Sequence, residues 1–331
     1  MASVLEIEDL HTDFFTYEGV VHALNGVDLA IAETEIMGLV GETGSGKSVL
    51  ATSIMNMVRF PGRVVQGSVR LDGQDLLKLE EAQLRRIRGV RIAMIATNPR
   101  SRLNPLLRVG GQIADIIRAH DAMSKQEAAN RAIGLIRAVG INDPERRARA
   151  YPHELSGGMA QRILIAMALA ESPRLLIADE ATNGLDVTVQ RQVLELIREK
   201  VAERRSSALI ITHDLGIVAQ YCQRVAIIYS GQIVEEAPVD ELFRNPRHPY
   251  TISLLASAKA ASRQRARLAL VGARPDLRHL PAGCLLHPRC PFAEDPCRTT
   301  LPTMRSIAPG HFVRCLRAEE PLQELVGAEP A

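Results

Sequence analysis

The opening part of the chain alternates between apolar and polar residues. Residues 4–8 and 27–31 show this two-residue period, which is typical of half-buried β-strands. The unbroken apolar run at residues 36–40 predicts a fully buried strand that leads into a glycine-rich segment. Residues 49–57 are then expected to form a helix, and residues 67–71 a further alternating strand. The beginning of the chain is therefore predicted to hold an antiparallel patch of β-sheet.

The middle of the chain changes to a helical pattern. Residues 112–149 are helical and charged, with Gly140 as the expected helix stop. The apolar runs 174–179 and 208–212 are typical of buried parallel strands, and residues 187–204 predict the helix that connects them. The predicted fold class is α/β, with a helical insertion in the middle.

The composition shifts towards Pro, Arg, His and Cys after about Glu236, so we expect a separate C-terminal extension over residues 236–331. This part holds four of the five cysteines, namely Cys284, Cys290, Cys297 and Cys315. In a reducing cytosol such a cluster indicates metal ligation more than disulfides. Cys222 stands apart and is expected to be a small buried hydrophobic residue.

The composition argues against a protein that binds nucleic acid or spans a membrane. The net charge is +2, aromatic residues make up 3% of the chain and Trp is absent, which leaves few side chains to stack on bases. We therefore expect no nucleic-acid partner. No apolar run approaches the roughly 18 residues that cross a bilayer, and the acidic, alternating N-terminus is unlike a secretory signal. The expected protein is cytosolic and does any membrane work through partners.

The glycine-rich segment at residues 41–48 reads GETGSGKS and matches the P-loop pattern G-x-x-x-x-G-K-[ST]. It lies between a predicted strand and a predicted helix, which argues against an incidental glycine turn. Backbone N–H groups of such a loop close around phosphates, while Lys47 reaches the β- and γ-phosphates and Ser48 binds Mg²⁺. The residues expected to bind nucleotide here are Gly41, Glu42, Thr43, Gly44, Ser45, Gly46, Lys47, Ser48 and Val49.

A second glycine-rich segment, LSGGMAQR at residues 155–162, precedes a predicted helix. It resembles the signature sequence of ABC ATPases, which reads LSGGM-x-QR in one family. The resemblance implies that Ser156, Gly157 and Gly158 bind the γ-phosphate of an ATP held by the opposite subunit. A capped helix would explain Ser156 but not the whole run.

Two adjacent carboxylates, Asp179 and Glu180, end a predicted buried strand, where unpaired charge is costly. The segment resembles the Walker B strand, which implies that Asp179 holds Mg²⁺ and that Glu180 is the general base for the attacking water. The following residues, ATNGLD, match the segment that ends in the D-loop aspartate, here Asp186. Relatives usually have Pro at position 181 and Thr-Ala at positions 183–184.

His213 follows the predicted strand 208–212 directly. It resembles the switch histidine that contacts the γ-phosphate and steadies the water of Glu180. A lone histidine is more often structural, but the order and spacing of the motifs favour the functional interpretation. The expected catalytic residues are therefore Lys47, Glu180 and His213.

The loop at residues 95–105, IATNPRSRLNP, departs from the resemblance at one position. Relatives typically read I-F-Q-N/D-P followed by LNP, so Thr97 stands where they have a glutamine that contacts Mg²⁺ and senses the transmembrane subunits. The rest of the loop matches, which argues against misalignment. We expect the site formed by this P-loop to bind ATP normally and to hydrolyse it slowly.

An aromatic side chain from the first strands is expected to stack on the adenine. Phe14, Phe15 and Tyr17 are the candidates, and we favour Tyr17. Packing within the sheet is an equally good explanation for any of the three.

The sequence NPRHPYT at residues 245–251 resembles the start of the C-terminal extension of oligopeptide and dipeptide importer ATPases. The four clustered cysteines match those with which some relatives bind a [4Fe–4S] cluster, for which four thiolates are the standard donors. Zinc, which also accepts four cysteines, and free thiols remain open alternatives.

These motifs together resemble the ATP-binding subunits of bacterial oligopeptide and dipeptide ABC importers over residues 4 to about 316. The resemblance implies an ABC-type P-loop NTPase with a RecA-like core, an antiparallel β subdomain and a helical subdomain at about residues 100–165. The nucleotide-binding domain would cover residues 1–235 and the extension residues 236–331.

The resemblance also implies the activity: a subunit that hydrolyses ATP, with Mg²⁺, to power peptide import. It would lie peripherally on the cytoplasmic face of the inner membrane, with two permeases, a second homologous ATPase as heterodimer partner and an extracytoplasmic substrate-binding protein. Nickel, sugars, glutathione and opines remain open as cargo. A soluble ABC ATPase acting on DNA or ribosomes is disfavoured, because such chains usually carry two ATP domains or a long coiled coil.

Overall fold

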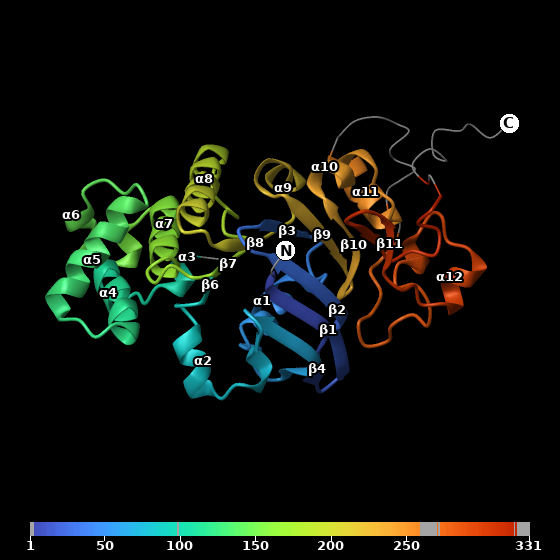
Figure 1. Ribbon diagram of the computed structural model, residues 1–331, viewed down its shortest axis with the longest axis horizontal. Helices are drawn as coiled ribbons and strands as arrows, with labels where there is room; N and C mark the ends of the chain where they lie inside the picture. The colour runs from blue at the N-terminus through green and yellow to red at the C-terminus, as the bar shows by residue number, and fades with distance from the viewer. Residues whose placement is uncertain (1–2, 98, 259–269, 271, 321, 323–331) are drawn as a thin grey trace. The chain divides into compact units, whose positions relative to one another are not determined.

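The computed structural model describes residues 3–97, 99–258, 270, 272–320 and 322 (Figure 1). The chain forms two compact units. The first consists of Met1–Leu5, Ile31–Glu35 and Asp75–Ile211, and the second of Glu6–Ala30, Ile36–Gln74 and Thr212–Ala331. These two units do not correspond to the predicted domains 1–235 and 236–331, so the boundary between residues 235 and 236 stays a prediction.

The first unit is built on parallel strands, of which the apolar runs predicted the last two along the chain. These are β6 (Ile92–Ile95), β7 (Leu175–Asp179) and β8 (Ser207–Thr212), with β7 between the other two. Every residue of β7 is buried, as expected for a parallel strand that is covered on both faces. Helix α8 (Val187–Glu203) connects β7 to β8. The predicted bounds of these two strands and of the helix are correct to within one residue at each end.

Most of the remaining first unit is helical. Its helices are α2 (Glu81–Ile87), α3 (Pro99–Arg102), α4 (Val109–His120), α5 (Lys125–Ala138), α6 (Pro144–Ala148) and α7 (Gly157–Ala168). The predicted helical stretch at residues 112–149 is therefore divided among α4, α5 and α6, which pack against one another (Figure 1). A capping box begins α5, because Ser124 Oγ accepts from the N–H of Glu127 at 3.2 Å and the Glu127 carboxylate accepts from the N–H of Ser124 at 2.9 Å. Gly140, with φ of 72°, follows the end of α5 as predicted.

The second unit contains most of the long N-terminal strands. The sheet order is β2-β1-β4-β5, formed by β1 (Ser3–Thr16), β2 (Gly19–Ala32), β4 (Gly62–Leu71) and β5 (Gln74–Asp75). The buried strand β3 (Ile36–Val40) has the predicted bounds, and helix α1 (Lys47–Ile54) begins two residues before the predicted start and ends three before the predicted end.

The C-terminal part of the chain extends the sheet that contains β3. Strand β3 pairs in parallel with β9 (Arg224–Tyr229), and β9 pairs antiparallel with β10 (Gln232–Pro238). Strand β10 then pairs with β12 (His311–Val313), which pairs with β11 (Arg305–Ala308). Two strands from beyond residue 300 are thus hydrogen-bonded into this sheet.

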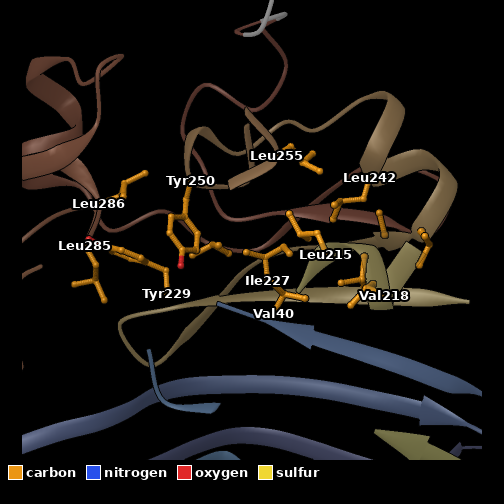
Figure 2. Packing of buried hydrophobic residues seen from close by; sticks show 14 residues of the cluster. Val40, Leu215, Val218, Ile227, Tyr229, Leu242, Tyr250, Leu255, Leu285 and Leu286 are labelled. Carbon is orange, nitrogen blue, oxygen red and sulfur yellow. The ribbon is translucent and has the colours of Figure 1, made fainter. Parts of the chain in front are cut away.

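The core of the second unit is shared between β3, β9 and the later helices. Figure 2 shows Val40 and Ile227 from the strands together with Tyr250, Leu285 and Leu286 from the C-terminal part. The helices around this core are α9 (Leu215–Tyr221), α10 (Val239–Arg244), α11 (Pro249–Ala258) and α12 (Asp295–Thr299). Cys222, expected to be buried, is half-buried and packs against this cluster. The C-terminal part therefore shares a continuous core with the strand that precedes the P-loop.

Among the helices that the structure describes, none is both long enough and apolar enough to cross a bilayer.

Candidate functional site

The P-loop connects β3 to α1 through backbone conformations that favour glycine. Gly44 has φ of 78° and Gly46 φ of 108°, values that residues with side chains rarely adopt. A Cβ on Gly41 would lie 2.3 Å from the carbonyl oxygen of Ile228. The motif therefore has glycine where the loop turns sharply and where it meets β9.

Two side chains inside the loop suit a phosphate ligand. Lys47 is buried, and its Nζ donates to the carbonyl oxygens of Gly41 at 2.7 Å and Glu42 at 3.0 Å. The Ser45 hydroxyl is buried, and it has no hydrogen-bond partner within the described part of the chain. A buried ammonium group and an unpartnered buried hydroxyl fit an anionic ligand that accepts hydrogen bonds. Thr43 and Ser48 are exposed and Val49 is half-buried.

Residues far along the chain hold the second position of the P-loop. The N–H of Glu42 donates to Tyr250 Oη at 2.8 Å. Arg289 Nη1 donates to the Glu42 carboxylate at 3.2 Å and 3.4 Å. The sequence did not single out either residue for the site. Tyr250 belongs to the HPY motif, which the sequence linked to the C-terminal extension. Arg289 immediately precedes Cys290, which the sequence linked to the cysteine cluster.

Tyr17 lies at the turn between β1 and β2 and is fully exposed. The other aromatic candidates are engaged: the guanidinium of Arg63 lies 4.3 Å from the ring centroid of Phe15, and the ring of Phe14 packs against Gly62. Tyr17 is therefore the most exposed of the three candidates.

The carboxylates of the first unit lie at the end of β7. Asp179 is its last residue and is buried. Glu180 follows with φ of 46°, and its carboxylate accepts a hydrogen bond from Asn183 Nδ2 at 3.0 Å. Such a left-handed conformation is uncommon outside glycine and clusters at functional sites. Asn183 is one of the positions at which the sequence differs from the usual family pattern, so this contact was not foreseen.

Thr97 lies at the same edge of the sheet as Asp179. Strands β6 and β7 are parallel neighbours, with Ile95 opposite Ala178, and Thr97 follows the end of β6 by two residues. Its side chain is half-buried, and its carbonyl accepts from Arg102 Nε at 3.5 Å. Its neighbour at position 98 lies outside the described residues.

The glycine-rich segment before α7 and the aspartate before α8 both act as helix caps. Ser156 Oγ accepts from the N–H of Met159 at 3.2 Å, and Asp186 Oδ1 accepts from the N–H of Val189 at 3.0 Å. A Cβ on Gly158 would lie 2.8 Å from Val189 Cγ1, so α7 and α8 approach closely at this glycine. Gly157 is half-buried at the start of α7. These contacts give local structural roles, and nucleotide contact by this surface stays a prediction.

The predicted site residues divide between the two units. The P-loop, Tyr17 and His213 belong to the second unit, where His213 directly follows β8 and is exposed. The first unit holds Thr97, Ser156, Gly157, Gly158, Asp179, Glu180 and Asp186.

The four clustered cysteines line one small, predominantly apolar cavity in the second unit. Burial raises the pKa of Cys290 to about 11 and that of Cys315 to about 12, and the neighbouring thiols act in the same direction. Burial also raises the pKa of Cys284. Among the residues described, however, no three His, Cys, Asp or Glu side chains are grouped so as to hold a metal ion. The fold thus brings the four thiols, all among the described residues, to one cavity without grouping them as a metal site.

Comparison with known protein families yields two matches along the chain. The family described as ABC transporter matches residues 24–183. The family described as oligopeptide/dipeptide transporter, C-terminal region, matches residues 234–297.

Similar proteins cover nearly the whole chain. The oligopeptide transport ATP-binding protein AppD of Bacillus subtilis is 44% identical over 97% of this chain and 98% of its own length. The dipeptide transport ATP-binding protein DppD of Escherichia coli is 41% identical over 95% of this chain and 96% of its own length. A solved dimeric ATP-binding cassette in a post-hydrolysis state with ADP and Pi is 26% identical, with a TM-score of 0.64 over 71% of this chain and 98% of that one. The chain has the ABC ATPase fold and belongs to the family of ATP-binding subunits of peptide ABC transporters.

Proposed function

We propose that this chain binds and hydrolyses ATP to power the import of peptides across the cytoplasmic membrane. The observation that carries the proposal is that one chain holds both an ABC cassette and the C-terminal region of oligopeptide and dipeptide transporters. The relatives that match over nearly the full length are named for oligopeptide and dipeptide transport. In the proposed complex the chain lies on the cytoplasmic face, with two permeases, a second ATPase and an extracytoplasmic binding protein.

Transport by the reconstituted complex tests the proposed cargo. The complete complex in lipid vesicles should take up a labelled oligopeptide only when ATP is present on the cytoplasmic side. Uptake of nickel, a sugar or an opine under the same conditions, without peptide uptake, would contradict the peptide assignment. Full peptide transport by a complex whose only ATPase is this chain would contradict the heterodimer.

The P-loop residues would bind the triphosphate of ATP. Backbone N–H groups at the start of α1 and the Lys47 ammonium group offer donors to the phosphates. The buried Ser45 hydroxyl, which has no hydrogen-bond partner among the described residues, supports the same assignment. Tyr17, with its exposed ring, would stack on the adenine. The loop and Tyr17 would thus bind the two ends of one nucleotide.

Catalytic roles are proposed for the residues at the ends of β7 and β8. The Ser48 hydroxyl and the buried Asp179 carboxylate are oxygen donors of the kind that Mg²⁺ prefers. Mg²⁺, when bound, neutralises charge that develops on the phosphates. Glu180 would accept a proton from the attacking water, and His213 would hold that water and the γ-phosphate in place. The hydrogen bond from Asn183 would keep the Glu180 carboxylate in one orientation.

A pair of cassettes would complete each nucleotide site. Ser156, Gly157 and Gly158 begin a helix, where backbone N–H groups favour anions. They would contact the γ-phosphate of an ATP bound by the partner ATPase, with Asp186 close to the same interface. The dimeric cassette that shares this fold supports a paired arrangement.

We expect Thr97→Gln to raise the ATPase rate of the assembled transporter several-fold without changing ATP affinity. The threonine oxygen is two bonds nearer the backbone than a glutamine oxygen, a difference of roughly 2.5 Å in reach. Mg²⁺ holds its ligands at about 2.0–2.1 Å, so a short side chain leaves the position to water. Steady-state hydrolysis and nucleotide affinity should be measured separately. Thr97→Ser, which keeps a short hydroxyl, should behave like the wild type. An unchanged or lower ATPase rate in Thr97→Gln would show that Thr97 does not slow hydrolysis.

We further propose that the four cysteines of the C-terminal part hold a [4Fe–4S] cluster. The cavity that the four thiols line supports this assignment, and four thiolates are the usual donors of such a cluster. Zinc, which also accepts four thiolates, is the alternative that the metal content of the protein decides. Because burial keeps the thiols protonated, metal binding would release protons. The cluster would tie Cys315, which follows β12, to the segment around Cys290.

Replacing one of these cysteines should remove the cluster and loosen the C-terminal part. We expect anaerobically purified wild-type protein to be brown with about four iron atoms per chain, and Cys290→Ser to lose most of the iron. Proteolysis after about residue 280 should then be faster, because metal binding contributes to folding. Cys222→Ser is the matched control, since Cys222 lies outside the cavity. Colourless wild-type protein with one zinc per chain, or iron retained by Cys290→Ser, would contradict the proposal.

A further inference from the structure

An ion pair joins the C-terminal part of the chain to the P-loop. The carboxylate of Glu42 is partly exposed, and Arg289 donates to it from a side chain that is only 9% exposed. The same Nη1 lies 3.4 Å from Tyr229 Oη, and the guanidinium carbon lies 5.8 Å from the centroid of that ring. Arg289 is thus held in place by the Glu42 carboxylate and by Tyr229.

The backbone of Glu42 is held from the same side. Its N–H donates to Tyr250 Oη at 2.8 Å, and burial raises the pKa of this hydroxyl above its ordinary value, so it stays protonated. The ring centroids of Tyr250 and Tyr229 lie 4.7 Å apart, and Figure 2 shows the two side chains next to each other. The side chain and the backbone of one P-loop residue are therefore both fixed by the C-terminal part.

The charge of Glu42 creates a problem for a loop that binds a polyanion. A carboxylate in the P-loop repels the phosphates, and the repulsion is strong where water is displaced. Arg289 offsets this charge and draws the carboxylate towards the core of the second unit. Without Arg289, the carboxylate would lose its ion-pair partner and could turn towards the phosphates.

We propose that Arg289 is a positioning residue for ATP binding, which acts by neutralising and holding Glu42, with Tyr250 fixing the backbone at the same position. The inference rests on the proposed function, in which the P-loop binds ATP. Arg289 would set nucleotide affinity through Glu42 and would not enter the chemical step. The C-terminal part would therefore contribute to the nucleotide site itself.

A double-mutant cycle tests this coupling. In the full-length protein, Arg289→Gln should weaken ATP binding about tenfold, because the Glu42 carboxylate, which has the same sign of charge as the phosphates, is left unpaired. Glu42→Gln alone should bind ATP more tightly than the wild type, because the carboxylate that repels the phosphates is gone. The double variant Glu42→Gln/Arg289→Gln should recover most of the lost affinity, because the repelling charge is gone. In the assembled transporter, Arg289→Gln should raise KM for ATP and leave kcat unchanged.

Controls separate charge neutralisation from a loss of structure. Arg289→Lys should keep most of the ATP affinity. Arg298→Gln, which removes one positive charge from an exposed helix position, should leave ATP affinity unchanged. Equal loss of affinity in Arg289→Gln and in the double variant would overturn the inference, as would a fall in kcat alone. Wild-type protein that fails to bind ATP would instead contradict the proposed function, so the two failures are distinguishable.

Discussion

Glu180→Gln is expected to reduce ATP hydrolysis by about 10²–10⁴-fold, the usual contribution of a general base, while ATP binding is retained. Glutamine has the size of glutamate and tolerates the left-handed backbone at this position equally well. It also keeps an oxygen that accepts the hydrogen bond from Asn183. The substitution therefore removes the proton acceptor and leaves the local structure in place. With binding intact and turnover blocked, the ATP-bound pair of cassettes should accumulate, which size-exclusion chromatography with bound nucleotide would detect.

A matched exchange elsewhere controls for the loss of one negative charge. Glu203→Gln changes an exposed carboxylate that pairs with Lys200, and its hydrolysis rate should equal that of the wild type. The measurement needs an assembly in which every copy of this chain carries the variant. Hydrolysis near the wild-type rate in such an assembly would rule out Glu180 as the base.

The strands were the most predictable part of this fold, where apolar runs are short and clearly bounded. Strand β3 has the predicted bounds because five apolar or small residues lead directly into the glycine-rich loop. The long strand β1 was recognised only in part. One of its inward positions is occupied by Thr12, which is fully buried and hydrogen-bonded to Ser53 at 2.9 Å. A buried polar pair hides the alternation on which such predictions depend.

Helix boundaries were predicted less well, for a different reason. The capping pair Ser124 and Glu127 marks the start of α5. The prediction treated residues 112–149 as one helical stretch and therefore did not place a helix start there. Helix α7 begins at Gly157, inside the segment 155–162 that was expected only to precede a helix. The prediction missed this first turn because glycine has low helix propensity.

The motifs could be predicted residue by residue, but the contacts that hold them could not. Arg289 and Glu42 are 247 positions apart, and no periodicity links them. Their contact depends on the core that the C-terminal part shares with β3 and β9. The bond from Asn183 to Glu180 is local, yet it needs the left-handed turn at Glu180, which the sequence does not reveal.

Lys47→Ala is expected to lower ATP affinity by about 10- to 150-fold, in contrast to Glu180→Gln. A hydrogen bond to a charged group contributes about 1.5–3 kcal/mol, and each 1.4 kcal/mol is about a factor of ten. The Lys47 ammonium group is buried and bonded to two carbonyl oxygens of the loop. Binding of ATP would replace these bonds with stronger ones to phosphate oxygens. Calorimetric titration with a non-hydrolysed ATP analogue measures the loss directly.

The size of the loss should depend on the number of phosphates if Lys47 reaches the β- and γ-phosphates. Affinity for AMP should be nearly the same in Lys47→Ala and in the wild type, whereas affinity for ATP should fall. Lys78→Ala, which removes an ammonium group that is 81% exposed beside Asp75, is the control for net charge and should bind both nucleotides normally. Unchanged ATP affinity in folded Lys47→Ala would show that the ammonium group does not touch the triphosphate. An equal loss for ATP and AMP would place its contact nearer the ribose than the terminal phosphates.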